Sequence, residues 1–246
     1  MRTLSWDGCV NVRDLGGLPT EDGAVTRFGR VVRADSVRGL TDAGWEALVG
    51  HGVARIVDLR WADELAEDEP RDVPVDVVHV ELLGERDGPF AEIDRRQRRL
   101  GDPTVRRRTG YTEFLESFPA NFAEAVTAVA EAPEGAVVVH CAGGVDRTGL
   151  VAAFLLRLAG VGLREIGLDY AESERNWAPH VGSWIDEAAD EGEREFRRML
   201  SRCPPEAITG VLEEVEARYG DVHAYLSEAG APKATLAAAR ARLLDP

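Results

Sequence analysis

Cys141 and Arg147 are separated by five residues that include a pair of glycines, and these residue types together suit an attack on phosphate. A cysteine reacts as its thiolate. An arginine guanidinium is a planar fork that binds two oxygens of one phosphate. Gly143 and Gly144 allow positive φ and a close approach of the backbone to a ligand. The spacing therefore predicts a nucleophile facing a bound tetrahedral anion.

The flanking residues predict the elements that position this loop. An apolar, β-branched run over 136–139 precedes His140 and indicates a buried strand, while residues 148–159 are typical of a buried helix. A strand, a glycine turn and a helix N-terminus in this order direct backbone N–H groups and the helix dipole toward an anion. The same arrangement favours the thiolate of Cys141 over the thiol.

Each residue of the loop has an expected role. We expect His140 to orient the loop through hydrogen bonds to backbone, and the Thr148 hydroxyl to donate to the cysteine sulfur as it leaves. The phosphate is expected to bind the six residues that follow Cys141, which are Ala142, Gly143, Gly144, Val145, Asp146 and Arg147.

The stretch from His140 to Thr148 resembles the signature loop of the cysteine-based protein tyrosine phosphatases. The chain also resembles their bacterial branch, typified by the mycobacterial tyrosine phosphatase B, in several segments that keep the same order. These segments cover residues 11–17, 32–41, 56–64, 169–173 and 219–226. A lone cysteine–arginine spacing is a weak signal, whereas this ordered set along nearly the whole chain is specific.

The resemblance implies a phosphomonoester hydrolase that acts on phosphotyrosine in proteins through a cysteinyl-phosphate intermediate. Its substrate would be a phosphorylated protein or another phosphomonoester, and its product phosphate, with no cofactor and no metal. A non-catalytic phosphoprotein-binding module and a rhodanese-like sulfurtransferase are the alternatives. The presence of Cys141, Arg147 and candidate acids favours the enzyme.

The general acid is open between two aspartates. Many tyrosine phosphatases carry it on a separate Trp-Pro-Asp loop, and this sequence contains no Trp-Pro-Asp. Asp146 resembles the loop aspartate of the bacterial branch, whereas Asp58 stands at the end of a predicted strand. We favour Asp146, and the competing role for either carboxylate is to orient Arg147 or a backbone turn.

Two features bear on the substrate in opposite directions. Branch members with dual and lipid activity usually have lysine before the loop aspartate, and Val145 occupies that place here. This favours phosphotyrosine over phosphoserine, phosphothreonine and phosphoinositides. Seven arginines within 95–108 either bind a second phosphate near the site or form a solvated helix face and loop. The usual role of such a charge run is the solvated face.

Composition limits the partners. The formal net charge of −15 argues against nucleic acid and anionic membrane surfaces. Three cysteines are too few for a disulfide framework and indicate a reducing compartment. The sequence has no basic-apolar leader and no apolar run near 18 residues, so we expect a cytoplasmic protein without integral membrane association. A non-classical export route would leave no such segment, and the oligomeric state stays open.

The pattern along the chain predicts an α/β fold, with a central, mostly parallel sheet flanked by helices and one catalytic domain over 1–246. Expected strands cover 30–34, 54–59, 75–82 and 136–140. Expected helices follow Thr41 and cover 111–132, 148–159, 163–173, 183–200, 205–219 and 232–244. The family resemblance implies that helices in the charged segment 176–203 fold over the site, so we expect a mobile helical lid there. Its Trp177 and Trp184 either pack in the core or contact an aromatic substrate.

Overall fold

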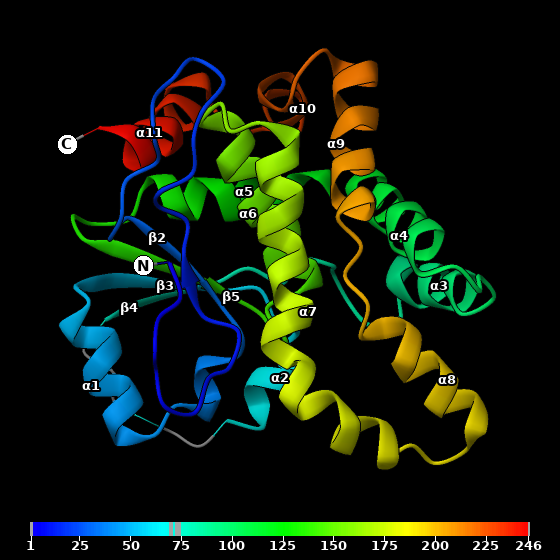
Figure 1. Ribbon diagram of the computed structural model, residues 1–246. Coiled ribbons are helices and arrows are strands. Elements are labelled where there is room, and N and C mark those ends of the chain that lie inside the picture. The colour runs from blue at the N-terminus through cyan, green and yellow to red at the C-terminus, as the bar shows by residue number, and fades with distance from the viewer. Residues whose placement is uncertain (1, 69–70, 72–74, 246) are drawn as a thin grey trace.

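A mixed, mostly parallel sheet stands at the centre of the computed structural model, which describes residues 2–68, 71 and 75–245 (Figure 1). Within these residues the strands lie in the order β1-β2-β5-β3-β4, and only β1 runs antiparallel to its neighbour. Their bounds are β1 (Arg13–Asp14), β2 (Val31–Ala34), β3 (Val53–Asp58), β4 (Asp76–His79) and β5 (Ala136–His140). The predicted α/β fold is confirmed.

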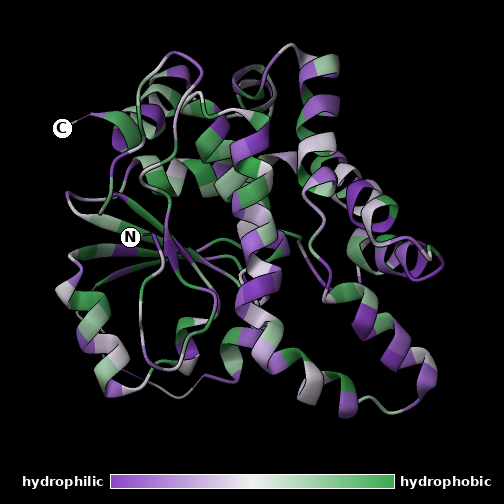
Figure 2. Ribbon diagram, viewed as in Figure 1, coloured by the Kyte–Doolittle hydropathy of each residue, from purple (hydrophilic) through white to green (hydrophobic). Residues whose placement is uncertain are grey.

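Strand β5 is buried on both faces, because its side chains alternate between two hydrophobic clusters. Val137 and Val139 pack with the helices of the larger cluster, whereas Ala136 and Val138 join the smaller cluster beneath helix α1. Such continuous apolar runs are typical of parallel strands covered on both faces. In Figure 2 the sheet is accordingly among the most hydrophobic parts of the ribbon.

Helices surround this sheet on both faces. The larger cluster draws its side chains mainly from α4, α5, α6, α9, α10 and α11. The bounds of the helices are α1 (Asp42–Gly50), α2 (Ala62–Ala66), α3 (Pro89–Gln97), α4 (Pro103–Ser117), α5 (Pro119–Ala130), α6 (Asp146–Leu158), α7 (Leu163–Asp186), α8 (Glu191–Leu200), α9 (Pro205–Tyr219), α10 (Val222–Glu228) and α11 (Lys233–Leu244), with a short 3-10 turn at Val37–Gly39.

The parallel strands bring their carboxyl ends to one edge. Asp58 at the end of β3 and Ala34 at the end of β2 both lie in register with His140 at the end of β5. Ligand sites of open α/β sheets lie at this edge. The loop between β5 and α6 therefore opens where a site is expected.

The helix predicted over 111–132 is wrong as a single element. Phe118 leaves the helical conformation, with φ −129° and ψ 39°, and Pro119 begins α5. A proline disfavours the helical conformation of the residue before it and donates no backbone hydrogen bond, but it suits a first helical turn. The chain therefore forms two helices, α4 and α5.

The two helices predicted over 163–173 and 183–200 are also redistributed. The first continues as α7 to Asp186, with Pro179 inside it at an exposed stretch where water reaches a carbonyl that lacks its helical partner. The second begins only at Glu191, where the Asp190 side chain caps α8 by accepting from the Glu193 N–H at 2.8 Å.

Helices α7 and α8 together form a two-helix arm beside the sheet edge (Figure 1). No residue of α8 is buried, and its ribbon is largely hydrophilic in Figure 2. A helix with so little apolar burial gains little stability from packing. The predicted lid segment 176–203 thus consists of the outer half of α7, a short connection and α8.

Candidate active site

Gly144 gives the β5–α6 loop its shape. Its φ is +65°, in the left-handed region that favours glycine, and a Cβ built there would lie 2.5 Å from the carbonyl oxygen of Ala34. Gly143 has neither feature, because its nearest neighbours would be 3.9 Å away. The tight turn therefore depends on Gly144 for both backbone conformation and space.

The carbonyl groups of residues 142–144 all accept hydrogen bonds from outside the loop. The donors are the Ser36 N–H to Ala142 O at 2.9 Å, Asn11 Nδ2 to Gly143 O at 3.0 Å and to Gly144 O at 3.2 Å, Trp177 Nε1 to Gly143 O at 2.8 Å, and Arg33 to Gly144 O at 2.8 Å. This anchorage fixes the loop from its carbonyl side. The opposite, N–H side can then form the concave anion-binding surface known as a nest.

The N-terminus of α6 completes this surface. Val145 is its N-cap residue and makes no side-chain capping hydrogen bond. The first N–H groups of a helix have no partner within the helix, and they carry the positive end of its dipole. An oxyanion beside Asp146 and Arg147, the first residues of α6, would be stabilised by both.

Positive charge lies beneath the loop in a buried cluster. Arg13 and Arg33 are 1% exposed, and both contact the carboxylate of Asp169, at 3.1 and 2.7 Å, as does the more exposed Arg2. Burial opposes ionisation of Asp169, but the three guanidinium groups outweigh it and hold its pKa well below the ordinary range. One carboxylate among three arginines leaves net positive charge, which explains how an acidic protein supports an anion site.

Cys141 begins the loop and is 3% exposed. His140 is fully buried, and its Nδ1 lies 3.2 Å from the Cys141 carbonyl oxygen, as expected of a residue that orients the loop. Burial lowers the pKa of His140. The Thr148 hydroxyl is buried without a hydrogen-bond partner in the described part of the chain, so its donation to the cysteine sulfur stays a prediction.

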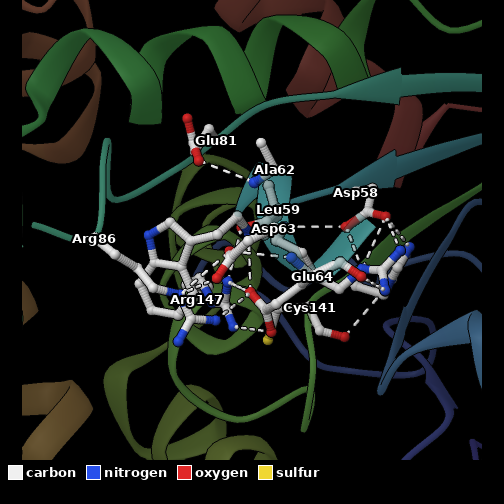
Figure 3. A network of polar contacts seen from close by, with 12 residues as sticks. Asp58, Leu59, Ala62, Asp63, Glu64, Glu81, Arg86, Cys141 and Arg147 are labelled. Carbon is white, nitrogen blue, oxygen red and sulfur yellow. Dashed lines mark hydrogen bonds and ion pairs between the residues drawn. The ribbon is translucent and has the colours of Figure 1, made fainter. Parts of the chain in front are cut away.

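Arg147 is held in place by α2 and the residue before it (Figure 3). Its guanidinium binds the Glu64 carboxylate at 2.7 and 3.2 Å and lies 4.1 Å from the Trp61 ring centroid. Burial of Glu64 opposes its ionisation, but the hydrogen bonds and charge of Arg147 outweigh this and lower its pKa. Glu64 also accepts the Trp61 N–H at 2.9 Å, so one carboxylate caps α2 and orients Arg147.

The family of this chain follows from comparison with known proteins. The model of the tyrosine phosphatase family matches residues 4–245. The chain belongs to this family. A tyrosine-protein phosphatase of Nostoc commune is 30% identical over an alignment of 222 residues that covers 86% of this chain and 73% of that protein. The triple specificity protein phosphatase PtpB of Mycobacterium tuberculosis is 27% identical over 96% of this chain and 97% of its own length.

A third relative agrees with this assignment. A putative tyrosine-protein phosphatase of Cupriavidus necator is 29% identical over 92% of this chain and 79% of its own length. The resemblance noted in the signature loop is therefore confirmed at the level of the whole chain. This protein is a tyrosine phosphatase and a hydrolase, whose family acts on phosphorylated substrates and releases phosphate.

Asp146 of this tyrosine phosphatase lies between the signature loop and α4. It accepts a hydrogen bond from the Tyr111 hydroxyl at 2.6 Å and forms an ion pair with Arg107, and its side chain is 44% exposed. Desolvation raises the pKa of Asp146. The charge of Arg107 and the hydrogen bond from Tyr111 lower it by more, so the net shift is downward. The partial exposure suits a group that exchanges protons with water.

Asp58 has a different environment. It is 4% exposed, and both of its oxygens accept hydrogen bonds from Arg60, the closest at 2.7 Å. Burial raises its pKa, but His140 and Arg60 outweigh burial and lower it. Its carboxylate also accepts the Arg60 backbone N–H at 3.0 Å. These contacts describe a carboxylate that fixes the chain after β3.

The arginine cluster over 95–108 is not one solvated face. Arg106 and Arg107 are 4% and 2% exposed, so the solvated-face prediction is wrong for these two. The others lie at the surface, where Arg98 pairs with Asp94 at 2.8 Å and Arg108 with Glu214 at 2.6 Å. Val145, which replaces the lysine usual in part of the branch, is partly buried against the larger hydrophobic cluster.

Some positions near the site have roles that sequence reasoning missed. Glu64 ends one of the segments that resemble the bacterial branch and Arg107 is one of seven arginines within 95–108, but the sequence pattern assigns neither a role. Trp177 donates to the loop instead of packing in the core, and Trp184 is 38% exposed beside Arg197. A glutamate three residues after the N-cap residue of a helix is a local signal for capping, and Glu64 fits it. The sequence around Arg107 contains no comparable signal for its contacts.

Two searches of the described residues bear on cofactors and membranes. No group of three or more His, Cys, Asp or Glu side chains in them is placed to hold a metal ion. None of the helices in the same residues combines the length and apolar character needed to cross a membrane.

Proposed function

We propose that this protein hydrolyses phosphotyrosine in proteins in two steps on one catalytic domain. In the first step the Cys141 thiolate attacks phosphorus in line with the tyrosyl oxygen. The S–P bond forms and the P–O bond breaks, while protonated Asp146 gives its proton to the leaving tyrosyl oxygen. The loop N–H groups and Arg147 stabilise the charge on the transferring oxygens.

The second step hydrolyses the cysteinyl-phosphate. A water molecule attacks phosphorus, its proton passes to the Asp146 carboxylate, and the S–P bond breaks to release phosphate and the thiolate. The unpartnered Thr148 hydroxyl is available to stabilise the departing sulfur. Every atom in this cycle comes from the substrate, water and the chain's own residues.

One observation carries this proposal more than any other. The signature loop is anchored by its carbonyl groups on Asn11, Arg33, Ser36 and Trp177, so it is preorganised for an oxyanion before the substrate arrives. Preorganised donors in a site shielded from water are the largest single contribution to many enzymatic rate enhancements. Such anchorage has no purpose in an inert buried cysteine.

Two observations support Asp146 as the acid over Asp58. Asp146 is partly exposed and lies in the loop, whereas Asp58 is 4% exposed and bound on both oxygens by Arg60. A group that donates and recovers a proton must reach both the substrate and water. Asp58 is assigned to holding Arg60 and the chain that follows β3.

Phosphotyrosine is the first choice of substrate. The alternative is a dual-specificity or phosphoinositide phosphatase, which the name of the triple specificity relative favours. Val145 favours phosphotyrosine, because it supplies no charge where part of the branch has lysine. Segment 176–203 is proposed as a lid that excludes water from the closed site.

The decisive experiment compares the wild type with Cys141→Ser on phosphotyrosyl, phosphoseryl, phosphothreonyl and phosphoinositide substrates. We expect phosphate release from phosphotyrosyl peptides that disappears in Cys141→Ser. Acid-quenched Asp146→Asn with substrate should carry a phosphate adduct on Cys141. No Cys141-dependent release from any member of the panel would overturn the enzyme mechanism and favour a phosphoprotein-binding module.

A further inference from the structure

Arg107 of α4 binds the loop aspartate and the end of α8 at the same time. Its NH1 contacts the Asp146 carboxylate and donates to the Tyr111 hydroxyl at 2.9 Å. Its Nε donates to the carbonyl of Arg202 at 2.8 Å, and its NH2 to the carbonyl of Leu200 at 2.5 Å. Arg107 is 2% exposed, so its side of each of these bonds is shielded from water.

The two carbonyl groups explain why Arg107 is stable there. Leu200 is the last residue of α8, and the last carbonyls of a helix have no partner within the helix. They also carry the negative end of the helix dipole, which attracts a cation. Arg107 therefore acts as the C-terminal partner of α8, and its position depends on where α8 ends.

Helix α8 is held against α3 and α4 by a separate contact. Phe196 lies between two guanidinium groups, with Arg98 at 3.9 Å and Arg106 at 4.6 Å from the ring centroid. An arginine over an aromatic face is attracted to the ring. Because no residue of α8 is buried, this contact and the Arg98–Glu193 ion pair at 3.6 Å contribute to the docking of α8, and neither is in direct contact with Asp146.

The charges that face Asp146 come from several elements. Arg106 and Arg107 on α4 and Arg147 on α6 are cationic, and Tyr111 donates a hydrogen bond. On the opposite side, Tyr170 of α7 and Cys203 after α8 are neutral near pH 7, because burial raises the pKa of Cys203 to about 11 and that of Tyr170 further. Among the cations, Arg107 is the one in direct contact with Asp146.

We propose that Arg107 is a positioning residue that couples the docking of α8 to the ionisation of the general acid Asp146. With α8 docked, the carbonyl groups of Leu200 and Arg202 hold Arg107 on Asp146 and favour its carboxylate form. When the end of α8 moves away, Arg107 loses these two acceptors and its hold on Asp146 weakens, so Asp146 is protonated at a higher pH than with α8 docked. This inference rests on the proposed acid role of Asp146.

The experiment follows Asp146 directly. In the Cys141→Ser background, the Asp146 side-chain carboxyl signal is titrated by NMR, and in the active enzyme the pH profile of kcat is measured with a phosphate ester of a poor leaving group. Activity requires protonated Asp146, so its ionisation sets the basic limb of the profile. We expect Arg107→Met to move the titration and the basic limb to higher pH, because a cation beside a carboxylate lowers its pKa.

Three further variants separate charge, docking and folding. Arg107→Lys keeps the charge and should leave the limb closer to wild type than Arg107→Met does. Phe196→Ala weakens the docking of α8 while it keeps Arg107 and Tyr111, the two side chains in direct contact with Asp146, and should move both readouts in the same direction as Arg107→Met. Arg108→Met removes the neighbouring arginine, which pairs with Glu214 instead, and should leave both at the wild-type position.

Each outcome has one reading. An Arg107→Met titration identical to that of Arg108→Met would overturn the control of Asp146 by Arg107. A Phe196→Ala limb at the wild-type position would overturn the coupling to α8. A shifted NMR titration without any shift of the kinetic limb would leave the Arg107 contact intact and instead remove Asp146 from the role of general acid.

Discussion

Glu64 accepts hydrogen bonds from Arg147 on both carboxylate oxygens, at 2.7 and 3.2 Å, and the same carboxylate caps the N-terminus of α2. The orientation of Arg147 is therefore set by the short helix α2. The face of the Trp61 ring also packs against the Arg147 guanidinium. A bidentate pair fixes both the position and the plane of a guanidinium.

We expect Glu64→Gln to lower kcat/KM for phosphotyrosyl peptides by about 100-fold, because small displacements of a substrate-binding group cost that much. Steady-state kinetics measure the loss. Glu67→Gln is the matched control, since Glu67 follows α2, is 72% exposed and pairs with exposed Arg38. If Glu64→Gln is as active as Glu67→Gln, Arg147 does not need this partner.

Asp146→Asn and Asp58→Asn should differ in their dependence on the leaving group. We expect Asp146→Asn to lower kcat about 10²- to 10⁴-fold with an unactivated phenyl phosphate and much less with an activated aryl phosphate, which needs no proton. Asp58→Asn should reduce both rates by a similar factor, because it disturbs Arg60. The reverse pattern would transfer the acid role to Asp58.

Gly144→Ala and Gly143→Ala test the loop at adjacent positions. At Gly144 the φ of +65° and the 2.5 Å approach to the Ala34 oxygen oppose a side chain, whereas at Gly143 the nearest atom is 3.9 Å away. We expect Gly144→Ala to lose on the order of 1–3 kcal/mol of unfolding free energy and most activity. Gly143→Ala should fold with nearly wild-type stability in denaturant titrations. Equal stability of the two variants would contradict this account of the loop.

Asp169 gives the fold a dependence on acid pH. Its pKa in the folded protein is depressed by Arg13, Arg33 and Arg2 below the roughly 3.9 of an unfolded chain. Its stabilising contribution is therefore complete above about pH 4 and is lost as the pH falls toward the folded-state pKa. Asp169→Asn should destabilise the protein at pH 7 by about 3–5 kcal/mol, because it leaves buried arginines unpaired.

The measurement for Asp169 is the free energy of unfolding between pH 2 and pH 7. The difference between wild type and Asp169→Asn should shrink below about pH 4. Asp76→Asn serves as control, because Asp76 is 45% exposed and pairs with Arg55 at the sheet edge. A pH-independent difference between wild type and Asp169→Asn would remove Asp169 as the origin of the acid sensitivity.

The proposed lid predicts a ligand-dependent sensitivity to proteases. Cleavage within 176–203 should slow when vanadate or phosphate occupies the loop, because a bound anion favours the closed arrangement. The sites are identified by mass spectrometry, and cleavage elsewhere on the surface serves as the internal reference. Equal rates with and without the anion would argue against a gate in this segment.

The sequence was sufficient for the elements that contain the chemistry. The apolar run before Cys141 predicted β5, and the glycine pair with Arg147 predicted an anion-binding turn, because both signals are local. The predicted helix boundaries near Phe118 and Glu191 were wrong. Pro119 and the capping residue Asp190 are local signals that mark the true boundaries. The role of Arg107 could not be predicted from the sequence. Its neighbours Arg106 and Arg108 are also arginines, and only tertiary packing gives the three different partners.

The anchorage of the signature loop also has a consequence during protein synthesis. The loop is translated before two residues that support it. Trp177 donates a hydrogen bond to the loop, and Asp169 binds Arg33, which donates to the Gly144 carbonyl. A nascent chain that has left the ribosome only as far as Cys141 carries the signature loop without these supports. The loop can take its anchored shape only after α7 has emerged and docked. A product of premature termination would therefore be inert, and the cell would meet an active enzyme only as a finished one.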